Sequence, residues 1–140
     1  MSKNRLVIQP DYDFELLGIT CHSREYKLAW ELNRQLGIRL IKQDDITLDL
    51  VREGQLIFSN YLFENGPVQY KLIRNKSVNQ SDNKVAFLLP ELQNFDFLFI
   101  IKGNPGGDIG IISKIKGIPL VNFVSRFEIS DIKAKENLIF

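Results

Sequence analysis

Apolar residues in this 140-residue chain are grouped in short runs, and the longest nearly unbroken run, FDFLFII, covers positions 95–101. The run is continuous rather than alternating, which is typical of a strand covered on both faces. Pro90 and Glu91 precede it, where a proline and an acid favour the start of a helical turn. The pattern predicts that Leu88–Gly103 is a short turn followed by the central strand of the fold.

Residues 24–36 have the periodicity of a helix. Leucines recur at every fourth position and make one apolar stripe, which we expect to face a sheet. Ser23 is the candidate N-cap of this helix, because a serine hydroxyl accepts a hydrogen bond from the first turn. Gly37 follows the last leucine, where a left-handed residue is favoured. The stripe consists of Leu28, Leu32 and Leu36.

Apolar runs on both sides of the predicted helix, at 14–20 and 38–42, predict a strand–helix–strand unit with a right-handed crossover. Two further runs, at 55–64 and 68–74, flank Asn65-Gly66-Pro67 and predict a hairpin, because Asn-Gly favours a tight turn. A second strand–helix–strand unit follows from the central strand. This second unit consists of the central strand, an isoleucine-rich helix that begins at Asp108 and ends near Gly117, and a strand at 120–127.

The remaining segments connect these elements. Residues 1–12 are predicted to be a loose lead-in and residues 75–83 a polar loop with nothing to bury. Ser130 is the candidate cap of a C-terminal turn that docks on the body of the protein. Together the pattern predicts one α/β (α+β) domain over residues 1–140, built as a two-layer sandwich of ferredoxin-like βαβ–hairpin–βαβ character. A doubly wound sheet is the alternative.

Composition narrows the classes of partner. Eighteen basic and seventeen acidic residues leave a formal charge of +1, which argues against a nucleic-acid footprint. The single Cys21 excludes an intrachain disulfide and favours a reducing compartment. No apolar stretch reaches the roughly 18 residues of a membrane span, and the N-terminal residues lack the apolar core of a signal peptide. We therefore expect a cytoplasmic protein with neither a nucleic acid nor a membrane as its partner.

Leu89-Pro90-Glu91, followed by Phe95-Asp96-Phe97, resembles the namesake motif of the IPExxVDY protein family. Leu89, Phe95 and Phe97 stand where the motif has Ile, Val and Tyr, and three residues instead of two separate Glu91 from Phe95. The resemblance implies membership in an uncharacterised family and adds no catalytic residue. Other stretches that look like that family are Tyr26-Lys27-Leu28-Ala29-Trp30 with Asn33, Leu36-Gly37, Asp44-Asp45 and the terminal residues 135–140.

The second half, with a strand, a glycine-rich loop, a helix and another strand, is similar in architecture to regulatory domains of the ACT type, which bind amino acids and form dimers. A strand-to-helix loop is also a position where anions meet backbone N–H groups. The candidate ligand residues are Gly103, Gly106, Gly107 and Asp108. The loop lacks a P-loop ending, and Asp108 would repel an anion, so a capped turn is the other interpretation.

The candidates for catalysis or metal binding are few. Cys21 and His22 are adjacent, so in a strand they point to opposite faces and make a poor nucleophile–base pair. A metal site would need further soft ligands. Asp96 lies within the apolar run and is either a general acid or a carboxylate that accepts backbone N–H bonds from the turn at 90–94. We expect no cofactor and no metal, and an enzyme built on Asp96 and Glu91 is the least favoured hypothesis.

Tyr26 and Trp30 give the strongest interaction signal. At about 100° per residue they lie on a different side of the helix from the leucine stripe. Asn33 and Arg34 lie nearby, and Tyr, Trp and Arg are enriched at binding hot spots. The chain's own hairpin or tail is the other candidate to cover the two aromatic residues. We therefore expect a non-catalytic protein-interaction or regulatory module, with a homodimer as one form, and a small-ligand-binding regulatory domain as the alternative.

Overall fold

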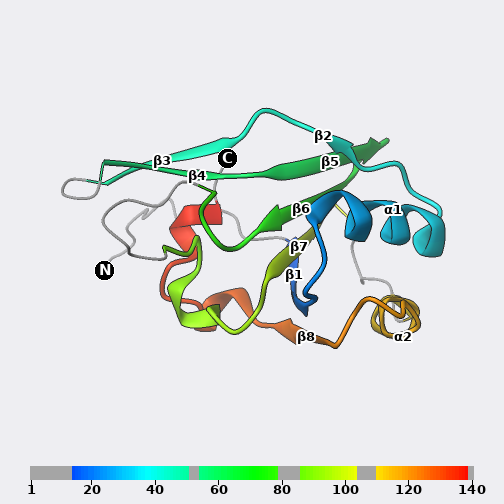
Figure 1. Cartoon of the computed structure of the whole chain (residues 1–140). Helices are drawn as coiled ribbons and strands as arrows, with labels where there is room; N and C mark the ends of the chain where they lie inside the picture. Colours follow the sequence, from blue (N-terminus) through cyan, green and yellow to red (C-terminus); the bar gives the residue numbers. More distant parts are fainter. Residues whose placement is uncertain (1–13, 51–53, 79–85, 104–109, 139–140) are drawn as a thin grey trace, which may run out of the picture.

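The computed structural model describes residues 14–50, 54–78, 86–103 and 110–138 (Figure 1). These residues form an α+β fold with a six-stranded sheet in the order β2-β5-β6-β7-β1-β8 and a separate two-stranded ribbon, β3-β4. The strands are β1 (Phe14–Thr20), β2 (Ile41–Lys42), β3 (Ile46–Leu50), β4 (Gly54–Phe58), β5 (Asn60–Asn65), β6 (Val68–Arg74), β7 (Phe97–Lys102) and β8 (Phe123–Phe127). The helices are α1 (Glu25–Leu36) and α2 (Ile111–Lys116), with 3-10 turns η1 (Pro90–Leu92), η2 (Ile129–Asp131) and η3 (Lys135–Leu138).

β7 is a central strand, as its apolar run predicts. It pairs with β6 on one side and with β1 on the other, and its first five residues are buried. The strand begins at Phe97, because residues 90–92 form the predicted turn and the backbone N–H of Phe95 donates to Leu92 O at 2.9 Å. The continuous apolar sequence is required since both faces of this strand are covered.

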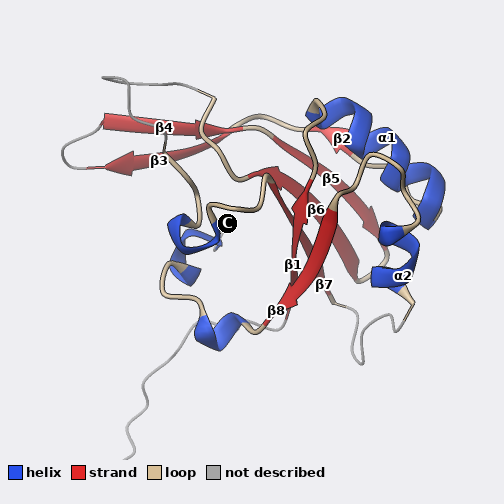
Figure 2. Ribbon diagram, turned by 60° about the horizontal axis from the view of Figure 1, so that its bottom comes forward, coloured by secondary structure: helices blue, strands red, loops and turns tan. Residues whose placement is uncertain are grey.

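The two faces of the sheet are covered by different parts of the chain (Figures 1 and 2). The helices α1 and α2 cover one face. The ribbon β3-β4, the segment at 86–92 and the C-terminal 3-10 turns lie on the other face. Each layer buries an apolar cluster against the sheet, and the covering residues include Leu28, Leu32, Ile111 and Ile115 on the helical face and Leu56, Phe58, Leu88, Leu89, Ile129 and Leu138 on the opposite face.

The predicted α+β class is confirmed, whereas the ferredoxin-like strand order is not. The order along the sheet puts β1 between β7 and β8, and all strand pairs in the described part of the chain are antiparallel. Because β7 and β8 both pair antiparallel with β1, they run in the same direction with β1 between them. The antiparallel pairing also rules out the doubly wound alternative, which needs a mainly parallel sheet.

Two predicted strands differ from the structure. The run at 55–64 is broken at the buried Ser59, so β4 joins the ribbon while β5 joins the main sheet. The strand predicted at 38–42 is reduced to the two residues of β2, and the following acidic segment forms β3. The predicted hairpin is confirmed in β5–β6, where Gly66 has φ of 61° at the first central position of the turn.

The predicted polar loop at 75–83 is wrong at its start, because Asn75 and Ser77 are buried. Residues 79–85 lie outside the described part of the chain. Ser23 does not cap α1, whose N-cap is Arg24 without a side-chain hydrogen bond, whereas Gly37 ends the helix with φ of 67° as predicted. Ser130 lies within η2 rather than at its cap, and Asp108 lies outside the described residues.

Within the described segments, no helix is both long and apolar enough to cross a membrane.

Candidate protein-interaction surface

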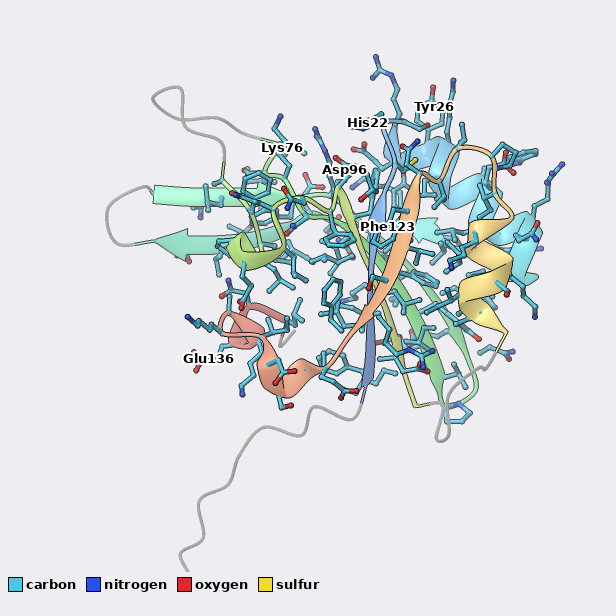
Figure 3. The ribbon with its side chains drawn as sticks, turned by 90° about the horizontal axis from the view of Figure 1, so that it is seen from below. His22, Tyr26, Lys76, Asp96, Phe123 and Glu136 are labelled. Carbon is cyan, nitrogen blue, oxygen red and sulfur yellow. The ribbon has the colours of Figure 1, made fainter. Side chains whose placement is uncertain are left out.

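Helix α1 presents its apolar residues on two sides. Leu28, Ala29 and Leu32 are buried against the sheet. Tyr26 and Trp30, one turn apart, are 57% and 58% exposed. Figure 3 shows Tyr26 on the outer side of the helix. The described part of the chain therefore leaves both aromatic side chains more than half open to solvent.

Arg34 extends the aromatic pair along the helix. Its guanidinium carbon lies 5.0 Å from the centroid of the Trp30 ring, within the range of a cation–π contact. Its Nε lies 3.6 Å from Glu31 Oε1. These contacts, three and four residues apart on one helix, hold a charged group over one face of the indole.

A groove of about 500 Å³ lies beside the aromatic pair. The connection between α2 and β8 supplies its other wall through the partly buried Leu120. Leu120 belongs to the segment at 120–127 that the pattern predicts as a strand, but β8 begins only at Phe123, so the place of Leu120 beside the groove was not predicted. The lining residues are Tyr26, Lys27, Trp30, Glu31 and Leu120.

Asn33 was predicted to lie beside the aromatic pair, but its side chain makes its hydrogen bonds elsewhere. Its Oδ1 accepts from the backbone N–H of Leu40 at 2.7 Å, and its Nδ2 donates to Leu40 O at 3.4 Å. The side chain thus ties the chain leaving Gly37 back to the end of α1. We therefore restrict the candidate surface, called the α1 surface below, to Tyr26, Lys27, Trp30, Glu31, Arg34 and Leu120.

The Leu89-Pro90-Glu91 stretch holds the C-terminal segment. Glu91 Oε2 accepts from the backbone N–H of Lys133 and Oε1 from that of Ala134, both at 2.8 Å. The Asn137 side chain returns a bond to Leu88 O at 2.7 Å. Glu91 is therefore engaged by backbone donors, which gives it a structural use that does not involve catalysis.

Asp96 stands just before β7, between Phe95 and Phe97 (Figure 3). Its Oδ2 accepts from the backbone N–H of Cys21 at 2.9 Å. The sequence predicts that its backbone donors lie in the turn at 90–94. The kind of donor is as expected, but the donor comes from the end of β1, which lies alongside β7 in the sheet.

Cys21 is buried and His22 is exposed, so the two side chains lie in different environments. Burial raises the pKa of the Cys21 thiol, a hydrogen bond with the backbone of Ser23 lowers it, and the Asp96 carboxylate raises it further. The thiol is therefore a weak nucleophile at neutral pH. Among the residues that the structure describes, no three His, Cys, Asp or Glu side chains gather as metal ligands would.

Most of the predicted ligand loop, including Gly106, Gly107 and Asp108, lies outside the described residues. Gly103 is described and has φ of 77°. A Cβ at this position would collide with the carbonyl oxygen of Pro67 in the β5–β6 turn. Gly103 therefore has a packing role, because only glycine allows this close approach and this backbone conformation.

A second hollow of about 540 Å³ opens beside β5 and β6 and was not predicted from the sequence. It contains Lys71, whose pKa is lowered by burial, raised by Glu64 and lowered by Lys102. Lys42 also lines it and forms an ion pair with Asp45 at 2.8 Å. The lining residues are Lys42, Gln43, Asp44, Ile46, Asn60, Leu62 and Lys71.

A comparison of the chain with protein-family models found no match, and neither did comparisons with curated proteins and with solved structures.

Proposed function

We propose that the protein is a non-catalytic interaction module that binds a partner protein through the α1 surface. The observation that carries this proposal is the pair Tyr26 and Trp30, two large aromatic side chains more than half exposed on one helix face and joined by Leu120 into one groove. Large apolar surfaces that stay open to solvent mark interaction sites in soluble proteins.

The chemistry of the α1 surface suggests the kind of partner. Its centre is aromatic and aliphatic, while Lys27 and Glu31 border it with opposite charges. An apolar centre with a polar rim is the usual anatomy of a protein interface. We expect the partner to offer an amphipathic helix, with apolar residues three and four apart for the groove and flanking charges for Lys27 and Glu31.

The wider identity of the protein is part of the same proposal. A lone, buried cysteine supports a cytoplasmic location. Membership in the IPExxVDY family, which the residues at 89–97 suggest, is part of this proposal. A catalytic role for Asp96 and Glu91 has the least support, since backbone N–H groups already engage both carboxylates.

Trp30→Ala tests the interaction function. Proteins captured by the wild-type chain are identified and purified, and their Kd is measured with both forms by calorimetry. The variant should bind at least about tenfold more weakly, as truncation of a hot-spot tryptophan does. Its urea midpoint should stay within error of the wild type, because the indole is largely exposed.

Ile41→Ala is the matched control, since Ile41 is 55% exposed on β2 and does not line the groove beside Tyr26 and Trp30. It should leave the Kd unchanged. Equal Kd values for the wild type and the Trp30 variant would contradict the proposal. A large loss of stability in the Trp30 variant with no loss of binding would do so as well.

The hollow beside β5 and β6 favours a second candidate function, the binding of a small anionic ligand. The half-buried ammonium group of Lys71 stands in a hollow with the amides of Gln43 and Asn60. The side-chain amides of Gln43 and Asn60 donate to Ile41 O and Asp44 O, so the lysine ammonium groups are the groups that suit a carboxylate or phosphate. In this hypothesis the regulatory ligand binds in the hollow beside β5 and β6 and not at the glycine-rich loop that the sequence predicts.

A thermal-shift screen with anionic metabolites tests the second candidate. A true ligand raises Tm in proportion to the logarithm of its concentration, and Lys71→Met should remove that rise. Lys116→Met, at an exposed position of α2, is the control and should keep it. No shift with any anion, or the same shift in both variants, excludes this function.

A further inference from the structure

Strand β8 forms one edge of the six-stranded sheet. It pairs with β1 on its inner side, and no strand of the described residues pairs with its outer side. Figure 1 shows β8 at the bottom of the sheet, and Figure 3 views the molecule from below with β8 in front. An edge strand of this kind offers unpaired backbone N–H and C=O groups.

This edge lacks the usual protection against pairing with another chain. Its sequence, FVSRF, contains neither proline nor lysine. Its one charged residue, Arg126, leans inward over β1 and donates from NH2 to Glu15 Oε2 at 3.0 Å. The opposite edge, β2, is only two residues long and carries Lys42. Short length and lysine are two devices that keep edges unpaired, so of the two edges of the six-stranded sheet, as far as the structure describes it, β8 is the one open to pairing.

An aromatic patch lies along the same edge, on the face of the sheet opposite the helices. Phe123 is 54% exposed and its ring centroid lies 6.0 Å from that of Phe95. Phe95 in turn meets Phe127 edge-on at 5.0 Å. The rings of Phe95 and Phe127 lie over Gly18, where a Cβ would come within 2.7 Å and 2.8 Å of them. Glycine is therefore needed under the patch, which stays half open at Phe123.

The sequence of β8 is a near palindrome about Ser125, with phenylalanine at both ends. We propose that two copies of this chain associate by antiparallel pairing of β8 with β8, around a two-fold axis at Ser125. In this register Phe123 faces Phe127 of the second copy, and Phe127 faces Phe123. A closed two-fold interface requires self-complementarity of this kind, which the palindrome supplies and which favours a second copy over an unrelated peptide.

Charge and packing fit this pairing. The two copies of Arg126 lie opposite Val124 of the other chain rather than opposite each other, so no like charges are directly paired across the axis. The formal charge of +1 per chain gives little overall repulsion. The axis is perpendicular to the sheet, so the aromatic patches of both copies lie on one face and merge. Each exposed Phe123 is then covered by an aromatic ring.

Sedimentation of the full chain tests the association. The wild type should be a dimer at tens of micromolar, and Phe123→Glu should weaken the dimer by about tenfold or more, as loss of an interface aromatic does. Trp30→Ala removes an equally exposed aromatic from the other face and should leave the dimer intact. A wild type that stays monomeric overturns the proposal, as does a dimer that survives Phe123→Glu or that is lost in Trp30→Ala.

A cross-link tests the register independently. At Ser125 the Cβ atoms of the two copies would be about 4.5–5.5 Å apart, as in any directly opposed pair, which allows a disulfide after a small adjustment. Ser125→Cys should therefore form a covalent dimer under mild oxidation. Glu128→Cys is the control, because residue 128 would face residue 122, about 20 Å from its own copy. No cross-link at 125, or an equal one at 128, rules out this register. The α1 surface takes no part, so this proposal and the proposed function can fail separately.

Discussion

At the scale of single residues, Asn75 organises the turn that leads into β7. Its side chain is fully buried. Nδ2 donates to Leu92 O at 3.0 Å, Phe95 O at 3.2 Å and Leu89 O at 3.4 Å, while Oδ1 accepts from Leu89 N at 2.8 Å. One amide thus supports the whole backbone of the turn, which has no sheet partner of its own.

Asn75→Ala should lower the free energy of unfolding by about 3 kcal/mol or more, because several buried backbone groups lose their partner at once. Urea unfolding measures the change. Asn122→Ala, at an exposed position, is the control and should stay within about 0.5 kcal/mol of the wild type. A cost for Asn75→Ala as small as that of the control would contradict this role.

Cys21 predicts a pH dependence of stability. Burial raises the pKa of its thiol in the folded state, so folding favours the protonated form. This stabilisation is complete below the ordinary thiol pKa of about 8.5 and is lost as the pH rises above it. Under reducing conditions, the wild type should lose stability relative to Cys21→Ala between about pH 8 and pH 10. A constant difference between the two proteins across that range would rule out the raised pKa.

At the scale of elements, the C-terminal segment is held by a small number of polar contacts. Glu91 accepts two backbone N–H bonds just before η3, and Asn137 donates back to Leu88 O. Leu138 then packs in the cluster on the non-helical face of the sheet. The contacts are local to the ends of the segment, so this unit can open while the sheet stays folded.

Glu91→Ala should therefore increase hydrogen exchange in residues 133–138, while the free energy of global unfolding falls by only about 1–2 kcal/mol. Glu128→Ala, another exposed acid, should leave exchange in this segment unchanged. Uniform loss of protection across the sheet would instead mean that the C-terminal segment and the sheet unfold together.

At the scale of the whole molecule, the sheet lies between two apolar layers, and alternate residues of β7 belong to each. Phe97 and Phe99 pack in the cluster under the helices, while Leu98 and Ile100 pack in the cluster on the opposite face. A central strand covered on both faces has no solvated side, which explains why residues 97–101 of β7 are all apolar.

Phe97→Ala and Ile100→Ala should each cost about 2–5 kcal/mol, although the two side chains lie on opposite faces of the sheet. Their effects should be nearly additive in the double variant, since they pack in different clusters. Ile41→Ala, at a position that is 55% exposed, is the control and should cost much less. If both variants had the same urea midpoint as the wild type, the placement of β7 in the core would be contradicted.

Patterns within single segments determined several elements of this fold. The strand at 14–20, the helix that ends at Gly37, the hairpin turn and the central apolar strand are all found where the sequence predicts them. Each depends on interactions between residues near one another in the chain: side-chain periodicity, glycine at positive φ and a continuous apolar run. The exposed aromatic face of α1 follows from the same helical geometry.

Only the tertiary structure decided how these elements combine. The strand order, the break at Ser59 that sends β4 and β5 to different sheets, and the place of Leu120 beside Trp30 all depend on pairing between distant segments. The same holds for the burial of Asn75 and for Cys21 as the donor to Asp96. Local patterns carry no information about which segments meet, because alternative strand orders can bury the same apolar residues, and the choice among them is made by packing in the complete fold.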